Sequence, residues 1–146
     1  MVAEEIGSAI KTLRVVKEVL IAAPADIVFQ TILEPHGPMK DMNMKLEPWP
    51  GGRWFRDLGN NTGHLWGHVQ VIKPPKVLEL IGPTMMSYPV ASHIQYRLTE
   101  QAGDTLLKFT HQAFGLIESG LELNVTKGWG EMLEQIRTAA EKKRGG

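Results

Sequence analysis

The chain of 146 residues contains no cysteine, which excludes disulfides, thiolate metal sites and cysteine nucleophiles. It also lacks an excess of charge, because 16 basic residues balance 16 acidic ones when the five histidines are counted as neutral. A neutral chain without a basic stripe has no electrostatic footprint for nucleic acid or for an anionic membrane surface. No stretch approaches the roughly 18 consecutive apolar residues of a membrane span, and the N-terminus has no signal-peptide pattern. We therefore expect a cytoplasmic protein that binds neither nucleic acid nor membrane.

Internal repeats, low-complexity tracts and long linkers are absent as well, and the length suits one domain. Apolar residues make up 42% of the chain, which is enough to form a hydrophobic core. We expect an N-terminal arm over residues 1–12 and one folded domain over residues 13–144.

Most of the chain is typical of short strands separated by turns. A first strand is predicted at 13–22, followed by a short helix at 25–33 and a helical turn at 39–42. Six strands then alternate with segments rich in Gly, Pro and Asn, at 44–48, 52–58, 64–72, 77–81, 92–100 and 105–112. Links this short join antiparallel neighbours, because parallel strands need a long crossover.

The last predicted element is a long amphipathic helix over residues 120–143. Ser119 and Glu122 match a capping box at its start. One helix face collects the apolar side chains of Val125, Trp129, Met132, Leu133, Ile136 and Ala140. A sheet with one apolar face and such a helix bury these surfaces against each other. The predicted fold class is therefore α+β, with a curved antiparallel sheet of six to seven strands wrapped on a long C-terminal helix and two short helices after the first strand.

The register of the last hairpin follows from its pattern. If Glu100 faces Thr105, one sheet face collects the paired residues Leu98 and Leu107, Tyr96 and Phe109, and Ile94 and His111. A slip of one residue would bury the charges of the other face, so this register is favoured. It points Tyr96, Phe109 and His111 inward.

The same alternation in the strand 64–72 points Leu65, Gly67, Val69 and Val71 inward, and His68 and Gln70 outward. In the strand 52–58 the two aromatic residues Trp54 and Phe55 point to opposite faces. We expect Trp54 to point inward, which places Arg56 inward too, toward the rim of the sheet.

Seven short segments follow one another along the chain in the order found in a known protein family. They are Ala23-Pro24 with Ile27-Val28-Phe29, Pro50-Gly51-Gly52-Arg53-Trp54, Gly67 ahead of Val69, Pro74-Pro75-Lys76-Val77-Leu78, Gly103-Asp104-Thr105-Leu106-Leu107, His111, and Gly128-Trp129. Together they resemble the Activator of Hsp90 ATPase homologue-1-like (AHSA1-like) family, over about Leu13 to Lys143. That family belongs to the START-like (SRPBCC) superfamily of polyketide cyclases and Bet v 1-like proteins.

The resemblance implies a helix-grip fold with a cavity between the sheet and the terminal helix. The family shares no catalytic constellation, so the resemblance implies no catalytic residue. Two positions depart from common members: Arg56 stands where an apolar residue is frequent, and Asn43 replaces a region that usually holds tryptophan.

Histidines and methionines are the residues to weigh as functional groups. His64 and His68 would lie roughly 13 Å apart on one strand, too far to share an ion, and we predict neither a metal nor a cofactor. His111, with Tyr96 nearby, is open to three interpretations: a hydrogen-bonded interior histidine, a polar group that orients a ligand, or a general acid–base.

The methionines either fill gaps or form a flexible gate from the second short helix and the Met85–Pro89 loop. Gly128 and Gly130 flank Trp129 within the last helix, which suggests close approach to the sheet or room for a guest.

The favoured function is the binding of a small hydrophobic ligand, aromatic or lipid-like, between sheet and helix. The predicted lining residues are Trp54, Leu65, Val69, Tyr96, Phe109, His111, Val125, Trp129, Met132 and Leu133. Two alternatives stay open, namely an enzyme of the polyketide cyclase/aromatase type and a domain that modulates a chaperone ATPase. Enzymatic activity is undecided and less favoured than binding, and both a homodimer and a chaperone partner stay open.

Overall fold

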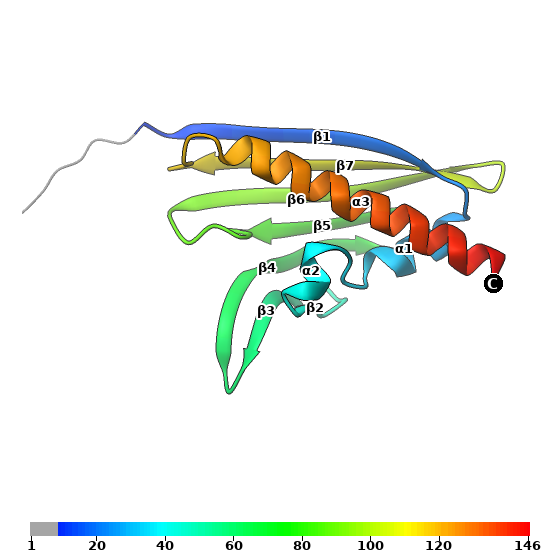
Figure 1. Cartoon of the computed structure of the whole chain (residues 1–146), viewed down its shortest axis with the longest axis horizontal. Coiled ribbons are helices and arrows are strands. Elements are labelled where there is room, and N and C mark those ends of the chain that lie inside the picture. The colour runs from blue at the N-terminus through cyan, green and yellow to red at the C-terminus, as the bar shows by residue number, and fades with distance from the viewer. Residues whose placement is uncertain (1–8) are drawn as a thin grey trace, which may run out of the picture.

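Seven antiparallel strands and a long C-terminal helix dominate the computed structural model, which describes residues 9–146 (Figure 1). The elements are β1 (Lys11–Ile21), α1 (Ala25–Ile32), α2 (Pro38–Asp41), β2 (Met44–Leu46), β3 (Arg53–Gly59), β4 (Thr62–Lys73), β5 (Val77–Gly82), β6 (Val90–Gln101), β7 (Asp104–Gly115) and α3 (Leu121–Gly145). The sheet order is β1-β7-β6-β5-β4-β3-β2. The predicted α+β class and helix-grip arrangement are confirmed, with α3 crossing one face of the sheet.

The ends of the predicted elements need two adjustments. Residues 1–8 of the predicted arm lie outside the described part of the chain, and its last two residues, Lys11 and Thr12, already belong to β1. The predicted capping box is wrong, because α3 begins after Gly120, which has φ 83° and no side-chain cap. Glycine adopts this left-handed conformation at low cost, and the Ser119 hydroxyl instead accepts a hydrogen bond from the Lys11 ammonium at 3.4 Å.

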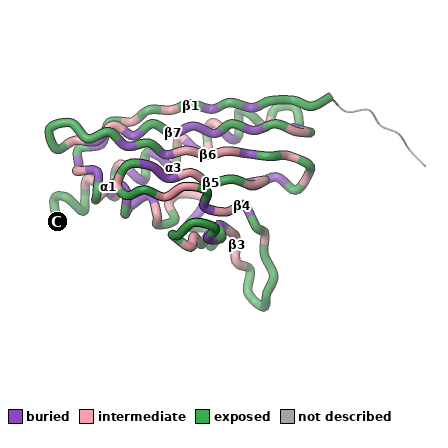
Figure 2. Tube along the Cα trace, turned by 180° about the vertical axis from the view of Figure 1, so that it is seen from behind, coloured by how far each residue is buried: buried purple, intermediate pink, exposed green. Residues whose placement is uncertain are grey.

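The register predicted for the β6–β7 hairpin is confirmed. Leu98 lies opposite Leu107, Tyr96 opposite Phe109 and Ile94 opposite His111. All six side chains are buried, and along β6 buried positions alternate with intermediate or exposed ones (Figure 2). The same alternation holds in most of β7, where it is interrupted by the buried Thr110. The hairpin therefore contributes a large part of the core-facing surface of the sheet.

Two β-bulges interrupt β4 and change which of its side chains point inward. Trp54 pairs with Gly67 while Phe55 pairs with Leu65, so Trp66 is an extra residue between them. Trp66 is consequently buried, with 4% of its surface exposed, whereas Leu65 lies outside with 45% exposed. The predicted inward orientation of Leu65 is wrong, because a strict period of two takes no account of an inserted residue.

The second bulge follows at once. Val69 pairs with Leu80, but Val71 pairs with the outward-facing Glu79. The predicted inward orientation of Val71 is therefore wrong. Val69 is buried as expected. On β3, the predicted inward orientation of Trp54 is confirmed, and Arg56, two residues on, is partly buried at the rim.

The core is closed by aromatic and aliphatic contacts between α3 and the sheet. The six apolar residues predicted on the inner face of α3 are all buried. The ring centroids of Phe109 and Trp129 lie 5.0 Å apart, and those of Tyr96 and Phe109 lie 5.1 Å apart. Rings at such distances in tilted or edge-to-face geometry attract one another beyond the burial of their area.

Replacing Ile136 of α3 by Ala should show that this contact holds the fold together. Ile136 is 1% exposed, so its truncation should lower the free energy of unfolding by about 2–4 kcal/mol. Leu123→Ala is the matched control, because Leu123 lies on the same helix and is 78% exposed; its effect should stay within about 0.5 kcal/mol. Urea denaturation measures both, and equal losses would contradict the assigned inner face.

Candidate ligand-binding site

An apolar pocket of about 170 Å³ lies between α2, the first half of α3 and the β5–β6 loop. Its lining residues are Pro38, Met39, Met42, Trp66, Met85, Leu121, Asn124, Val125, Gly128, Trp129 and Met132. The second short helix and the Met85 loop thus face each other across the pocket, as the gate interpretation of the methionines requires. The thioether side chains of Met39, Met42 and Met85 form part of the pocket wall.

Gly128 keeps this pocket open. No atom beyond its own helix and chain neighbours lies within 4 Å of the position that a Cβ would take at Gly128. At Gly130, by contrast, a Cβ would lie 3.4 Å from the Lys17 ammonium on β1. Each of the two interpretations therefore applies to one glycine. Gly128 borders free space, as room for a guest requires, and Gly130 allows Lys17 of the sheet to approach the helix closely.

A narrower slot lies on the other side of two methionines. It has a volume of about 30 Å³, and its wall includes Trp54, Tyr96, Met39 and Met132. Such a volume holds one or two water molecules at most. Met39 and Met132 are the only described residues that line both the slot and the pocket. The wall between the two spaces therefore consists of two flexible side chains.

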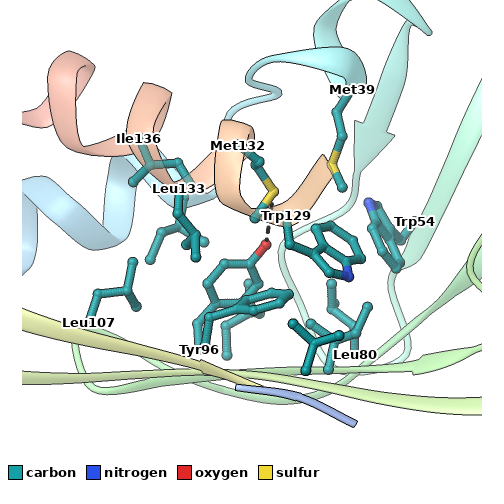
Figure 3. Packing of buried hydrophobic residues seen from close by; sticks show 14 of the residues in the cluster. Met39, Trp54, Leu80, Tyr96, Leu107, Trp129, Met132, Leu133 and Ile136 are labelled. Carbon is teal, nitrogen blue, oxygen red and sulfur yellow. Dashed lines mark hydrogen bonds between the residues drawn. The ribbon is translucent and has the colours of Figure 1, made fainter. Parts of the chain in front are cut away.

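Tyr96, on β6, contacts the wall that Met39 and Met132 form between the slot and the pocket. Its hydroxyl points at the Met132 sulfur, to which it donates a hydrogen bond of 3.5 Å (Figure 3). Burial raises the pKa of Tyr96 above its ordinary value, so the phenol stays neutral. A thioether is a weak acceptor, and the hydroxyl could exchange it for a better partner.

His111 is fully buried, and both of its ring nitrogens are engaged by side chains. The indole Nε1 of Trp129 donates a hydrogen bond of 2.9 Å to His111 Nδ1. Nδ1 is therefore the acceptor, and the neutral ring carries its proton on Nε2, which donates to the Ser92 hydroxyl at 3.0 Å. Burial lowers the pKa of His111 to about 4. The first interpretation of His111, a hydrogen-bonded interior histidine, describes this geometry, and its effect is to fix the indole of Trp129.

The ten predicted lining residues are distributed over three places. Val125, Trp129 and Met132 line the pocket, and Trp54 and Tyr96 line the slot with Met132. Val69, Phe109, His111 and Leu133 are buried but line neither space, and Leu65 lies on the outer side. Trp66 is the aromatic wall residue that the sequence did not reveal, because only the bulge in β4 turns it inward.

The chemistry of the pocket wall is almost entirely apolar. Asn124 and the Trp66 indole supply its polar side-chain groups, and no carboxylate, histidine or hydroxyl lines it. Within residues 9–146, no three His, Asp or Glu side chains gather closely enough to hold a metal ion. No described helix combines the length and hydropathy that crossing a membrane takes. The lining is therefore suited to apolar contacts.

Comparison with known proteins assigns the family. The profile of the Activator of Hsp90 ATPase homolog 1-like protein family matches residues 22–141. The chain belongs to this family. No curated protein matches the chain by sequence.

Solved structures with the same fold are similar over nearly the whole domain. An uncharacterised protein from Rhizobium leguminosarum has a TM-score of 0.72 at 20% identity, over 94% of this chain and 99% of its own. CalU16 from Micromonospora echinospora has a TM-score of 0.62 at 19% identity, over 96% and 94%. The di-domain ARO/CYC protein StfQ of the steffimycin biosynthetic pathway has a TM-score of 0.64 at 12% identity, over 92% of this chain and 52% of its own. At these identities the likeness establishes the shared fold.

The buried imidazole should make stability depend on pH. The pKa of His111 is about 4 when folded and about 6.5 in an unfolded chain. The unfolded chain therefore binds the proton more readily between these values, so stability is complete above about pH 6.5 and falls as the pH drops toward 4. Between pH 7 and pH 5 this contribution should decrease by about 2 kcal/mol.

Denaturant titrations of the protein and of His111→Gln at both pH values test this. Glutamine can accept from Trp129 and donate to Ser92 without titrating, so its stability should change less over the same interval. Equal changes in the two proteins would contradict the buried neutral histidine.

Proposed function

We propose that the domain binds a small apolar molecule in the pocket between α2, α3 and the β5–β6 loop. The observation that carries the proposal is the free space beside Gly128, in a wall formed by four methionines and two tryptophans. Folded interiors leave few voids larger than a water molecule, and glycine within a helix costs roughly 1 kcal/mol relative to alanine. This chain has both a void and a helical glycine beside an apolar pocket, and this combination favours a binding function.

The volume of the pocket narrows the class of ligand. A dry cavity of about 150 Å³ accommodates benzene, whereas sites for drug-sized molecules span about 300–1,000 Å³. At about 170 Å³, the pocket as it stands matches one aromatic ring. A longer or lipid-like chain would require Met39 and Met132 to turn aside and join the slot to the pocket, a change that unbranched thioether side chains make readily.

The other two candidate functions receive less support. A cyclase of the ARO/CYC type would need groups that move protons at the ligand, and the pocket wall has none. The family name refers to activation of the Hsp90 ATPase, and a chaperone partner, like a homodimer and a cytoplasmic location, stays a prediction.

Filling the space beside Gly128 should abolish binding without unfolding the domain. The Gly128→Leu side chain would project into the pocket, and leucine also favours the helix over glycine by roughly 0.8 kcal/mol. In NMR titrations with toluene and indole, the protein should show saturable shifts at Trp129, Trp66 and Met42. Gly128→Leu should bind at least tenfold more weakly and melt no lower.

Gly130→Ala is the control for this experiment. It also replaces a helical glycine, but its methyl group faces Lys17 and not the pocket, so binding should be unchanged. Undiminished binding in Gly128→Leu would place the ligand elsewhere, and the absence of saturable shifts with either compound would contradict the proposed function.

A further inference from the structure

Arg56 stands out in an open groove that adjoins the slot. The groove runs along β2, β3 and the tip of the β3–β4 hairpin. Arg56 lies there between Met44 on β2 and His64 on β4, its direct partners across the two ladders. Its guanidinium Nε is buried and has no hydrogen-bond partner among the described residues. Within residues 9–146 the side chain also takes part in no ion pair.

The two carboxylates of the groove are already occupied by other cations. Lys45 contacts Asp57 at 2.7 Å, and Arg53 grips Glu47 through two hydrogen bonds of 2.9 and 2.8 Å. The hydrogen bond from Arg53 holds the pKa of Glu47 down to about 2, and that from Lys45 lowers the pKa of Asp57. Both acids are therefore ionised and paired, and the charge of Arg56 is left without a counterion.

Arg53 and Arg56 differ in their position on β3. Arg53 lies on the outer face, where its guanidinium covers the Phe55 ring at 4.7 Å. Arg56 shares the inner face with Trp54, which lines the slot. Met44 and Leu46 line both the slot and the groove, so Arg56 lies where the apolar interior meets the polar surface.

A partly buried guanidinium with an unsatisfied N–H is costly in a folded protein, and such groups call for an explanation. A bound oxyanion supplies one. The planar fork of arginine matches a carboxylate with two parallel hydrogen bonds, which a lysine cannot reproduce. The apolar surface of Met44 and Trp54 beside it suits the hydrocarbon part of the same molecule.

We propose that Arg56 binds the carboxylate of an amphipathic ligand, a small aryl-alkyl carboxylic acid. The placement of its apolar part rests on the proposed function above. The carboxylate lies against the Arg56 guanidinium at the groove, and the hydrocarbon part follows the slot past Met44 toward the pocket. Met39 and Met132 turn aside to let it pass. His64, directly across from Arg56, borders the carboxylate on its other side.

Calorimetric titration with 4-phenylbutanoate and with its neutral amide tests the assignment. The acid should bind about 10- to 100-fold more tightly than the amide, as expected for charge-assisted hydrogen bonds to a sheltered guanidinium. Arg56→Gln should remove this preference. Arg97→Gln is the control, because it changes the net charge equally but at an exposed position of β6 that does not line the groove, and it should keep the preference. A preference that survives Arg56→Gln, or that is absent from the unchanged protein, overturns the proposal.

A second measurement separates this proposal from the proposed function. The ¹⁵N-edited signal of the Arg56 Nε–H should shift on addition of 4-phenylbutanoate, and that of Arg53 should not. If the amide binds in the pocket but the Arg56 signal stays unmoved by the acid, the carboxylate site is wrong and the apolar pocket stands. If the amide fails to bind while acetate shifts Arg56, the anion site stands and the pocket proposal fails. The same titration is finally made with inorganic phosphate. If phosphate binds at Arg56 more tightly than 4-phenylbutanoate and acetate do, the assignment of a carboxylic acid is wrong.

Discussion

The hydrogen bond between the Trp129 indole and His111 connects the long helix to the inner face of the sheet. It runs from α3 to β7 and continues through the imidazole to Ser92 on β6. All three residues are buried, so Trp129 and His111 would each lose a hydrogen bond without water to replace it if the helix moved away. The helix is therefore held at a fixed height above the sheet, and Phe109 packs between the two layers against Trp129.

The pocket follows from this fixed height. Trp129 fills the interval between helix and sheet on one side, while Gly128, the preceding residue, offers no side chain on the neighbouring side. The methionines of α2 and of the β5–β6 loop cover the remaining gap without filling it. The pocket, the slot and the groove then follow one another, with Met39 and Met132 between the first two and Met44 and Leu46 between the last two. Apolar character declines along this series, and the unpartnered charge of Arg56 lies at its outer end.

Much of the fold could be predicted from the sequence because it rests on two simple periods. The alternation in β6 and β7 determines both the inner face and the register, and the apolar spacing in α3 determines its buried face. The period of two failed in β4, where the bulge at Trp66 exchanged the positions of Leu65 and Trp66. The start of α3 was misjudged because a glycine in the left-handed conformation replaced the expected serine cap.

The candidate site could be predicted only in part, since a cavity depends on what does not fill the space. Inward-facing residues such as Val69, Phe109 and Leu133 satisfy the same pattern whether they line a void or pack in the core. The glycine at 128 and the methionines carried the more useful signal, as they mark free volume and a movable wall. Xenon enters dry apolar cavities of about 150 Å³, and a crystal pressurised with xenon tests the central claim most directly. The account predicts a xenon site bounded by Gly128, Met42 and Trp66, and electron density showing that space filled by protein side chains, with no xenon bound, would contradict it.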